Sequence, residues 1–292
     1  MNITSSTNRT SPVPQEVAAR VALACAGLGG DPSIAMGITV HGSATEFLSA
    51  VHDGNDVAAL TAKMRRRIRN FATGARTARV LEHTRQCGLG ILIPEHELWP
   101  TQLCDLRGLA PLVLWVRGDA DALSAPSVAL TGTSAATAIG IHTAIELSTG
   151  LAQRGWVIAA GAGGGIDQIA LRGADAMNGK SVLVAPASLD RIRSAGNRQV
   201  QVSELPPGMT ATVRAQRRSK HLLAALAVKT IIVEAGATSG ALRVAEGARA
   251  MRRPVGVVLG PPATAPSPGC ALFGGRDDVT VVESIVDADR LR

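Results

Sequence analysis

The sequence predicts an α/β protein in which a doubly wound, mostly parallel sheet follows a helical N-terminal region. From residue 127 onward, short apolar runs alternate with helix-like segments, which is typical of a parallel sheet covered by helices on both faces. Between residues 14 and 88 the chain is rich in alanine, and apolar residues recur at helical spacing. With 292 residues, the chain can hold one large domain or two small ones.

We divide the chain into a lead-in (residues 1–13), a helical region (14–88) and a sheet domain (89–292). The lead-in is polar and is expected to be disordered. The helical region contains the run "DVAALTAKMRRRIRNFATGARTARVLEHTRQ", in which apolar residues follow helical spacing. Residues 88–118 are predicted to form a connecting segment that carries two short apolar runs, "GILI" and "PLVLWVRG".

The predicted strands of the sheet domain are six short apolar runs. In chain order they are "SVALTG", "WVIAAG", "KSVLVAP", "QVQVSEL", "KTIIVEA" and "PVGVVLG". Helices are predicted over residues 138–154, 166–177, 217–227 and 240–252, because each of these segments lies between two strands and has helix-like spacing.

Three of these strands end in residues that suit a binding site. Ligands of doubly wound sheets bind at the carboxyl ends of the strands, near the switch in strand order. Gly132, Thr133 and Ser134 end and follow the first strand, a glycine loop follows the second, and Glu234 ends the fifth. Glu234 could cap the turn that follows it or hydrogen-bond to a ligand. We therefore expect a site where the three strand ends meet.

The glycine loop lies in "AAGAGGGIDQIA", residues 159–170. Gly161, Gly163, Gly164 and Gly165 precede a predicted helix whose first amides lack internal partners and favour an anion, as in a phosphate site. Asp167 lies at the helix start, where a carboxylate commonly caps free amides. The loop is neither a Walker sequence nor a complete G-x-G-x-x-G pattern. Phosphate binding and tight helix–strand packing both remain open at this point.

The charge of the chain favours a polyanionic partner. Thirty Lys and Arg against 23 Asp and Glu give a formal net charge of +7, although an arginine-rich composition could produce this charge without any site. With three Phe, three Trp and no Tyr, the protein should hold nucleic acid by phosphate contacts rather than by base stacking. The run "RRRIR", residues 65–69, is either a solvated helix face or a secondary phosphate contact.

Several classes of protein are not expected. The four cysteines are far apart and include no CxxC pair, which argues against a zinc site or a disulfide framework. The histidines show no metal-site pattern. No apolar run approaches the ~18 residues of a spanning helix, and "MNITSSTNRTSPVPQE" has no apolar core of signal-peptide type. We expect a cytoplasmic protein without membrane contact, metal or cofactor.

From Trp99 to Gly260, six motifs occur in the order typical of one family. "WPTQLCDLRGLAPLVLWVRGD" is similar to that family's opening, and "VALTGTS" and "AGAGGGIDQIAL" are similar to its first strand and glycine loop. "SELPPG" matches a family turn, and "SKHLLAALA" is similar to the helix that follows it. "TIIVEAGATSGALRVAEGARAMRRPVGVVLG" matches the last strand–helix–strand unit. The chain thus resembles the DprA (Smf) DNA-processing family, and the shared order is more specific than any single motif.

The resemblance implies an extended Rossmann-like fold that binds single-stranded DNA and hands it to a RecA-type recombinase, in DNA recombination or transformation. It also implies a homodimer and no catalysis, so the protein is not expected to be an enzyme. The DNA would follow a basic pocket at the strand ends. The candidate DNA-contacting or phosphate-contacting residues are Gly132, Thr133, Ser134, Gly161, Gly163, Gly164, Gly165, Asp167, Arg214, Arg217, Arg218, Lys220, Ser239 and Gly240.

The chain departs from the family pattern at charged positions. Two family arginines fall on Ser134 and Gly164, a histidine falls on Leu171, and an Arg-Asn-Arg triplet falls on residues 219–221, which read Ser-Lys-His. Three lost charge-assisted contacts would weaken binding by about two decades. Four basic residues within 214–220 could compensate, because a helix places residues three and four apart on one face.

These departures leave a second function open. A nucleotide-binding sensor of the same Rossmann-like superfamily would use residues 161–165 and 238–240 to hold one phosphate ester each, without acting on DNA. Phosphoribohydrolases of this superfamily carry a PGGxGTxxE loop. The corresponding run here, "EAGATSGALRVAE", lacks the PGG sequence and the motif's spacing to glutamate, so hydrolase activity is not expected.

Overall fold

The computed structural model of the protein describes residues 14–55, 57, 60–193, 196, 198–260 and 267–292, so the predicted lead-in lies outside the described residues. The described chain begins with five helices, α1 (Pro14–Cys25), α2 (Pro32–His41), α3 (Ala44–His52), α4 (Ala62–Phe71) and α5 (Gly74–Gln86). A side-chain oxygen caps the start of each of the last four, from Asp31, Ser43, Thr61 and Thr73. These caps explain why the alanine-rich region divides into short helices.

The sheet elements follow. They begin with β1 (Gly90–Leu92), the 3₁₀ helix η1 (Thr101–Leu109), β2 (Leu114–Arg117), the 3₁₀ helix η2 (Ala120–Leu123), β3 (Ser127–Gly132), α6 (Ala138–Gln153), β4 (Val157–Gly161), α7 (Ile166–Ala176) and β5 (Ser181–Ala185). They continue with the 3₁₀ helix η3 (Leu189–Arg191), β6 (Gln199–Ser203), α8 (Val213–Leu226), β7 (Lys229–Glu234), α9 (Gly240–Ala250) and β8 (Val255–Val257). The last elements are α10 (Pro268–Gly274), β9 (Val279–Val281) and α11 (Ile285–Arg290).

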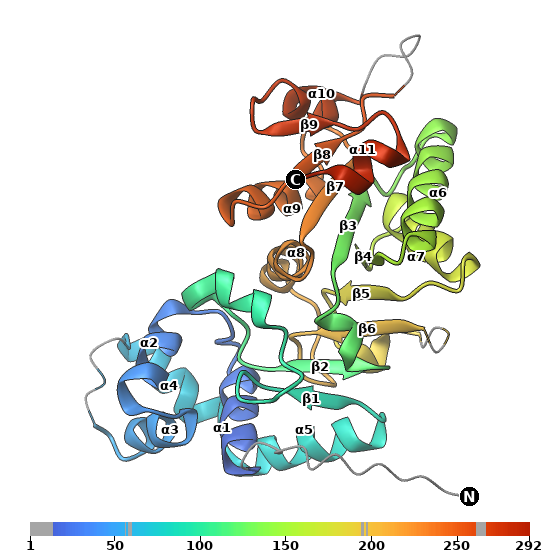
Figure 1. Ribbon diagram of the computed structural model, residues 1–292. Helices are drawn as coiled ribbons and strands as arrows, with labels where there is room; N and C mark the ends of the chain where they lie inside the picture. The colour runs from blue at the N-terminus through green and yellow to red at the C-terminus, as the bar shows by residue number, and fades with distance from the viewer. Residues whose placement is uncertain (1–13, 56, 58–59, 194–195, 197, 261–266) are drawn as a thin grey trace, which may run out of the picture.

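The described strands form one nine-stranded sheet in the order β1-β2-β6-β5-β4-β3-β7-β8-β9 (Figure 1). Strand β2 pairs antiparallel with β1 and β6, and the other pairs are parallel. All six predicted strands are present as β3 to β8. The predicted α/β class, with a doubly wound and mostly parallel sheet, is confirmed.

Residues 88–118, predicted to be a connecting segment with two short apolar runs, contain two strands of the sheet. Their two apolar runs supply β1 and β2, which extend the sheet at one end. The strands have three and four residues, too few to show alternation in the sequence. Their pairing is fixed by β6, since Trp115 lies opposite Ser203 and Val116 lies opposite Val202. Because β6 comes more than eighty residues later, local sequence does not reveal this edge.

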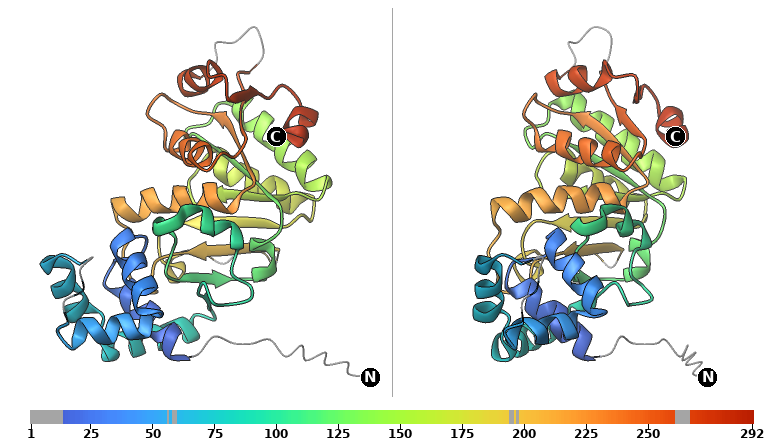
Figure 2. Two further views of the ribbon diagram at one scale, coloured as in Figure 1. Left: turned by 60° about the vertical axis from the view of Figure 1, so that its left-hand side comes forward. Right: turned by 90° about the vertical axis from the view of Figure 1, so that its left-hand side faces the viewer.

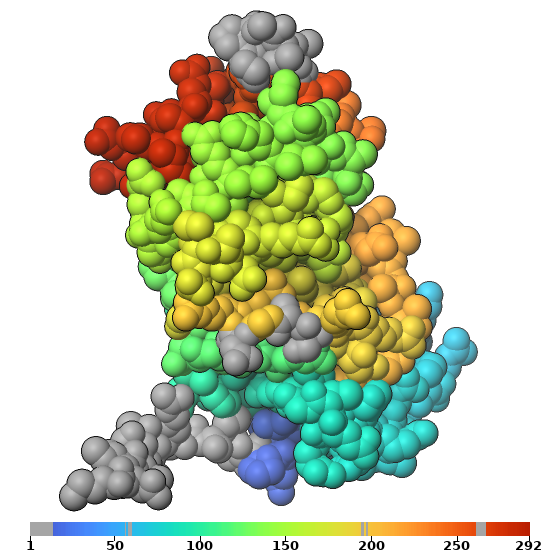
Figure 3. Space-filling view, turned by 90° about the vertical axis from the view of Figure 1, so that its right-hand side faces the viewer, coloured from blue at the N-terminus to red at the C-terminus, as the bar shows by residue number. Residues whose placement is uncertain are grey.

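Helices cover both faces of the parallel part of the sheet. Val128 and Leu130 of β3 pack into a core with α6 and α7, whereas Ala129 between them packs into a core with α8 and α9. This alternation follows from the two-residue period of a strand. Figure 1 shows α6 and α7 on one side of the sheet and α8 and α9 on the other, and Figure 3 shows the outer surface of α6 and α7.

The helices α1 to α5 lie against the β1–β2 end of the sheet (Figures 1 and 2). One core joins the two regions, and it contains Phe47 of α3 together with Ile93 and Trp115 near the sheet edge, all fully buried. Trp115 Nε1 donates a hydrogen bond of 3.1 Å to Thr84 Oγ1 of α5. The indole N–H of Trp115 therefore has a hydrogen-bond acceptor although the ring is buried, and this contact holds α5 against the sheet.

Candidate functional site

The strand order places a site next to β3. From β3 the chain builds β4, β5 and β6 on one side, and it then returns to β7 on the other side of β3. The crevice outside the carboxyl ends of the strands at such a switch is where doubly wound sheets bind ligands. A cavity of about 500 Å³ opens there, which we call the strand-end cleft. It is lined by the loops after β3 and β4, by one face of α8 and by the β7–α9 turn.

Most of the predicted residues meet in this cleft. They are Gly132, Thr133, Ser134, Gly161, Gly163, Gly164, Asp167, Lys220, Ser239 and Gly240. Gln216, which the sequence analysis did not single out, also lines the cleft. It lies four residues before Lys220 and so on the same face of α8, a spacing that could have identified it. The predicted convergence of three strand ends is confirmed, because Thr131, Gly161 and Gly236 all contribute to the lining.

The glycines of the loop after β4 have different roles. Gly165 has a φ of +61°, and a Cβ there would lie 2.3 Å from the carbonyl oxygen of Thr133. A Cβ on Gly161 or Gly163 would lie 2.6 or 2.9 Å from Asp167 Oδ2. These three positions therefore need glycine for packing within the protein. At Gly164 a Cβ would have its nearest neighbour 4.0 Å away, so this glycine leaves open space for an approaching ligand.

Asp167 fills much of the expected anion cradle with its own carboxylate. Thr131 Oγ1 donates to Asp167 Oδ1 at 2.7 Å, and the backbone of Gly132 and Gly163 also donates to this carboxylate. Burial raises the pKa of Asp167 to about 6, while these hydrogen bonds and the charge of Lys220 act in the opposite direction. A ligand phosphate must therefore bind beside Asp167 and not in its place. The charge of the cleft changes near pH 6.

Lys220 brings the positive charge of α8 into the cleft. Its side chain lies over the start of α9, since a Cβ on Gly240 would be 2.5 Å from Lys220 Cε and 2.7 Å from Nζ. A glycine at this position gives the lysine room to cross the helix start. Ser239 Oγ accepts a hydrogen bond of 3.3 Å from the backbone of Ala241 and so caps α9. The ammonium group thus lies beside a helix N-terminus, and an anion there would meet both.

The arginines of α8 are not among the described residues that line the cleft. Arg218 forms an ion pair of 2.5 Å with Glu204, and both side chains are mostly buried. Arg214 donates a hydrogen bond of 3.2 Å to the carbonyl oxygen of Gly29 in the helical region. Both line a separate cavity of about 130 Å³ between α8 and the N-terminal helices. Arg217 is exposed, and it is not among the described residues that line either cavity.

Burial raises the pKa of the Glu204 carboxyl, and the nearby charges of Arg218 and Arg214 oppose this effect. A buried carboxylate of this kind holds its arginine partner firmly, because removing either one would leave an uncompensated charge. Arg218 also donates to the carbonyl oxygen of Leu109 at 3.4 Å. It therefore joins α8 to the residue that follows β6 and to η1, and it lines the separate cavity and not the strand-end cleft.

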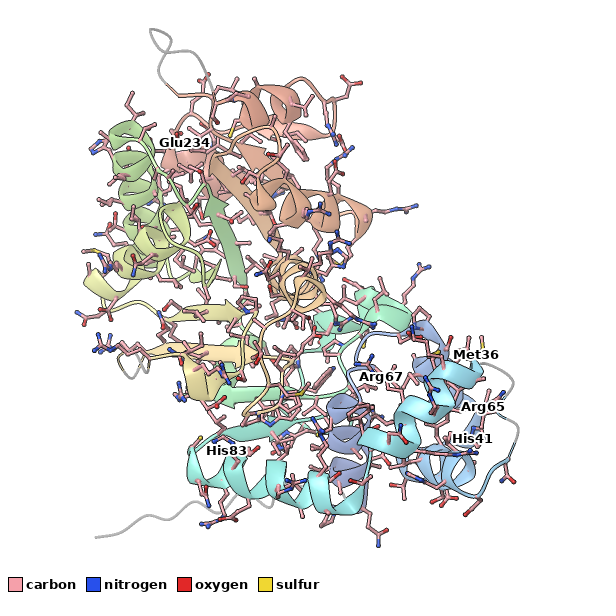
Figure 4. All side chains as sticks on the ribbon, turned by 180° about the vertical axis from the view of Figure 1, so that it is seen from behind. Met36, His41, Arg65, Arg67, His83 and Glu234 are labelled. Atoms are coloured by element: carbon pink, nitrogen blue, oxygen red, sulfur yellow. The ribbon has the colours of Figure 1, made fainter. Side chains whose placement is uncertain are left out.

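Glu234 and the arginine run of α4 make contacts within the protein. Glu234 Oε2 accepts hydrogen bonds from the Thr137 backbone at 3.0 Å and from Thr137 Oγ1 at 3.2 Å. It thus caps the start of α6, and not the turn that follows its own strand (Figure 4). In the run 65–69, Arg67 Nε donates to the carbonyl oxygen of Ala26, and Arg69 Nε donates to that of Val51 at 3.2 Å. These two arginines hold neighbouring segments of the helical region.

The fold and the cleft define a Rossmann-like α/β protein with an open cavity at its topological switch point. Within this class, residues 90–287 match the family model described as DNA recombination-mediator protein A. The chain belongs to this family, and the resemblance inferred from the order of its motifs is confirmed.

Two relatives illustrate the match in sequence. The chain is 37% identical over 193 residues to a DNA processing protein DprA from Mycobacterium tuberculosis, covering 62% of this chain and 50% of that protein. It is 29% identical over 183 residues to DNA processing protein DprA from Streptococcus pneumoniae, covering 60% of this chain and 64% of that protein. The chain thus spans about half the length of the Mycobacterium relative.

Two solved structures illustrate the match in fold. The X-ray structure of DNA processing protein A from Streptococcus pneumoniae has a TM-score of 0.76 at 19% identity, covering 97% of this chain and 99% of that chain. A structure of DNA processing protein A from Helicobacter pylori, reported for its single-stranded DNA binding mode, has a TM-score of 0.60 at 24% identity. It covers 68% of this chain and 93% of that chain. The extended Rossmann-like fold is confirmed.

Two further properties concern the described part of the chain. None of its helices is both long enough and apolar enough to span a membrane. Within the same residues, no three His, Cys, Asp or Glu side chains are grouped so that they could hold a metal ion.

Proposed function

We propose that this chain binds single-stranded DNA in the strand-end cleft and acts in DNA processing and recombination without catalysing a covalent step. The observation that carries the proposal is the position of Lys220, which places a cation in an open cavity at the switch point of the sheet. Family membership and the single-stranded DNA binding mode reported for the Helicobacter pylori protein support the same function. A net charge of +7 would attract the strand over a distance.

The DNA would be held mainly by its phosphates. No aromatic side chain is among the described residues that line the cleft, so the bases have no stacking platform there. Lys220, the open loop position at Gly164 and the hydroxyl of Ser134 form the contact surface. Because phosphate contacts carry little sequence information, binding should depend weakly on base sequence and strongly on salt.

Transfer of the bound strand to a RecA-type recombinase, homodimer formation and a cytoplasmic location belong to the same proposal. They are supported by the family to which the chain belongs. The oligomeric state is tested by sedimentation equilibrium at several protein concentrations. Recombinase loading is tested by measuring whether the protein accelerates filament formation on DNA that is coated with a single-strand-binding protein.

A nucleotide-binding sensor is the second candidate. A cavity of about 500 Å³ is within the usual size range of small-molecule sites, and Asp167 with Ser239 could position a nucleotide. The two candidates differ in competition. A mononucleotide should displace bound DNA and raise the melting temperature only if the cleft is a nucleotide site.

The decisive experiment is a fluorescence anisotropy titration of a labelled oligothymidylate at two salt concentrations, with ATP as competitor. Lys220→Glu should weaken binding by about tenfold to a hundredfold, because a charge-assisted contact contributes about 1.5–3 kcal/mol. Lys63→Glu is the matched control, since Lys63 is exposed on α4 and undergoes the same change of charge. Equal affinity of the Lys220→Glu and Lys63→Glu variants would contradict the proposed site.

A further inference from the structure

A second cavity on the other side of α8 has a basic lining. It has a volume of about 790 Å³ and lies between η1 and α9, and we call it the η1–α9 groove. Its charged lining residues are Arg107, Arg243, Arg252, Asp105 and Glu246, and His221 and Cys104 also line it. The helix α8 packs between α9 and η1 (Figure 2), so it separates this groove from the strand-end cleft.

Both carboxylates of the groove are already neutralised by arginines outside its lining. Asp105 forms an ion pair of 2.7 Å with Arg253. Glu246 forms ion pairs of 3.2 Å with Arg249 and 3.0 Å with Arg276. The positive charge of the remaining arginines in the groove is therefore not compensated from within it.

Those remaining arginines are exposed and have no partner in the part of the chain that the structure describes. The guanidinium groups of Arg107, Arg243 and Arg252 each lack a hydrogen bond or ion pair to any described residue. Arg107 also has an unusual backbone conformation, with a φ of 50° and a ψ of −128°. A positive φ is uncommon for residues other than glycine, and such strain tends to occur at binding sites.

The pKa of His221 is affected by the positive charges in and near the groove. Its pKa is lowered first by burial and then by the charges of Arg218 and Arg243. The imidazole is therefore neutral among cations, and it can donate or accept a hydrogen bond without adding charge. An anion that enters the groove would offset the repulsion that these arginines exert on one another.

The groove and the strand-end cleft lie on neighbouring faces of α8. Lys220 lines the cleft and the next residue, His221, lines the groove. Arg217 is exposed. It lies about one helical turn before Lys220 and His221 on α8, three and four residues earlier. A strand that leaves the cleft at Lys220 would meet Arg217 as it crosses the helix and would then reach the groove.

We propose that the η1–α9 groove is a second phosphate-binding track, which continues the path of single-stranded DNA from the strand-end cleft around α8. This inference rests on the proposed function and adds a specific surface to it. A short oligonucleotide fills the cleft alone, whereas a longer one also occupies the groove. Affinity should therefore rise with length beyond what the cleft can accommodate.

A native cysteine allows a direct test. Cys104 lies in the groove and is exposed, whereas Cys25 and Cys270 are buried and Cys87 is partly exposed elsewhere. The rate of Cys104 alkylation is measured by mass spectrometry with oligothymidylates of about 6 and about 30 nucleotides, lengths below and well above a common site size. The long oligonucleotide should slow alkylation of Cys104 severalfold. The short one should not, and Cys87 should react at the same rate throughout.

A charge-removal series gives an independent result. Changing Arg107, Arg243 and Arg252 to glutamine should lower the slope of log K against log salt by about 2 for the long oligonucleotide, at about 0.7 per phosphate contact on a single strand. The affinity for the short oligonucleotide should remain unchanged. The matched control replaces three exposed arginines outside the groove and the cleft with glutamine, namely Arg79, Arg172 and Arg292.

The possible outcomes are distinct. If long DNA binds but leaves Cys104 reactive and the slope unchanged in the triple variant, the second track is refuted while the cleft proposal stands. Protection of Cys104 by poly-glutamate but not by DNA would also refute the track and would favour an acidic protein partner. If neither oligonucleotide binds the unchanged protein, the proposed function itself fails, and the inference fails with it.

Discussion

Replacing Asp167 with asparagine should remove a pH dependence from the stability of the folded state. Burial is the main cause that raises the pKa of this carboxyl from 3.8 to about 6. The folded protein therefore binds the proton more tightly than the unfolded chain does. This group stabilises the fold most at low pH, and its contribution is lost as the pH rises through 6. The shift of about 2 units corresponds to about 3 kcal/mol at low pH, of which about 1 kcal/mol is present at pH 5 and almost none at pH 7.5.

Urea unfolding of the wild type and the Asp167→Asn variant at pH 5 and pH 7.5 measures this contribution. The change in unfolding free energy between the two pH values should differ between the proteins by about 1 kcal/mol, because the variant lacks the carboxyl at position 167. Asp175→Asn, at an exposed position of the same helix, should behave like the wild type. If the wild type and Asp167→Asn show the same pH dependence, the carboxyl is not held as the structure indicates.

Two further changes test the supports of the site. Gly165→Ala should lower the unfolding free energy by about 1–3 kcal/mol, because the alanine would take a φ of +61° with its Cβ 2.3 Å from the carbonyl oxygen of Thr133. Gly164→Ala, with open space around it, should cost no more than about 0.5 kcal/mol, and equal melting temperatures of the two variants would contradict these distinct roles. Arg218→Met should destabilise the protein by about 3–5 kcal/mol by leaving Glu204 buried without its partner. The double variant Arg218→Met/Glu204→Leu should recover much of that loss in urea unfolding, and no recovery would count against a buried ion pair.

The parallel core of the fold could be predicted from the sequence, whereas its antiparallel end could not. The strand β3 reads as a continuous apolar run because both of its faces are buried, and the same holds for β4 and β7. The strands β1 and β2 are short and depend on β6, which is distant in the sequence. Their apolar residues therefore looked like part of a connection, although Trp115 is among the largest fully buried side chains.

At the site, the sequence predicted which loops meet. It did not predict which glycines are needed for packing and which leave space for a ligand. The position of the glycine loop followed from strand and helix spacing. The assignment of Gly165 to packing and of Gly164 to open space depends on how closely Thr133 and Ser134 approach from another strand end. No local sequence pattern contains the distance between this loop and residues 133–134. The sequence alone therefore does not distinguish phosphate binding from tight helix–strand packing in the loop.

The basic residues of α8 show the same limit. Helical spacing correctly puts Arg214 and Arg218 on one face, four residues apart, and both line the same cavity. The spacing does not predict that Glu204 pairs with Arg218. Glu204 follows β6, and β6 and α8 come together only when the whole sheet has formed. Lys220, two residues after Arg218, lies on a different face and reaches the cleft.

The two ends of the sheet have a consequence for self-association. In the described part of the chain, the sheet ends in β1 on one side and β9 on the other, and each has only three residues. Such short strands offer few unpaired backbone groups to a neighbouring molecule, which discourages the edge-to-edge growth that leads to aggregation. The homodimer proposed above is therefore expected to form through the side chains of helices and loops, and a change that disrupts that contact should leave the sheet of each copy intact.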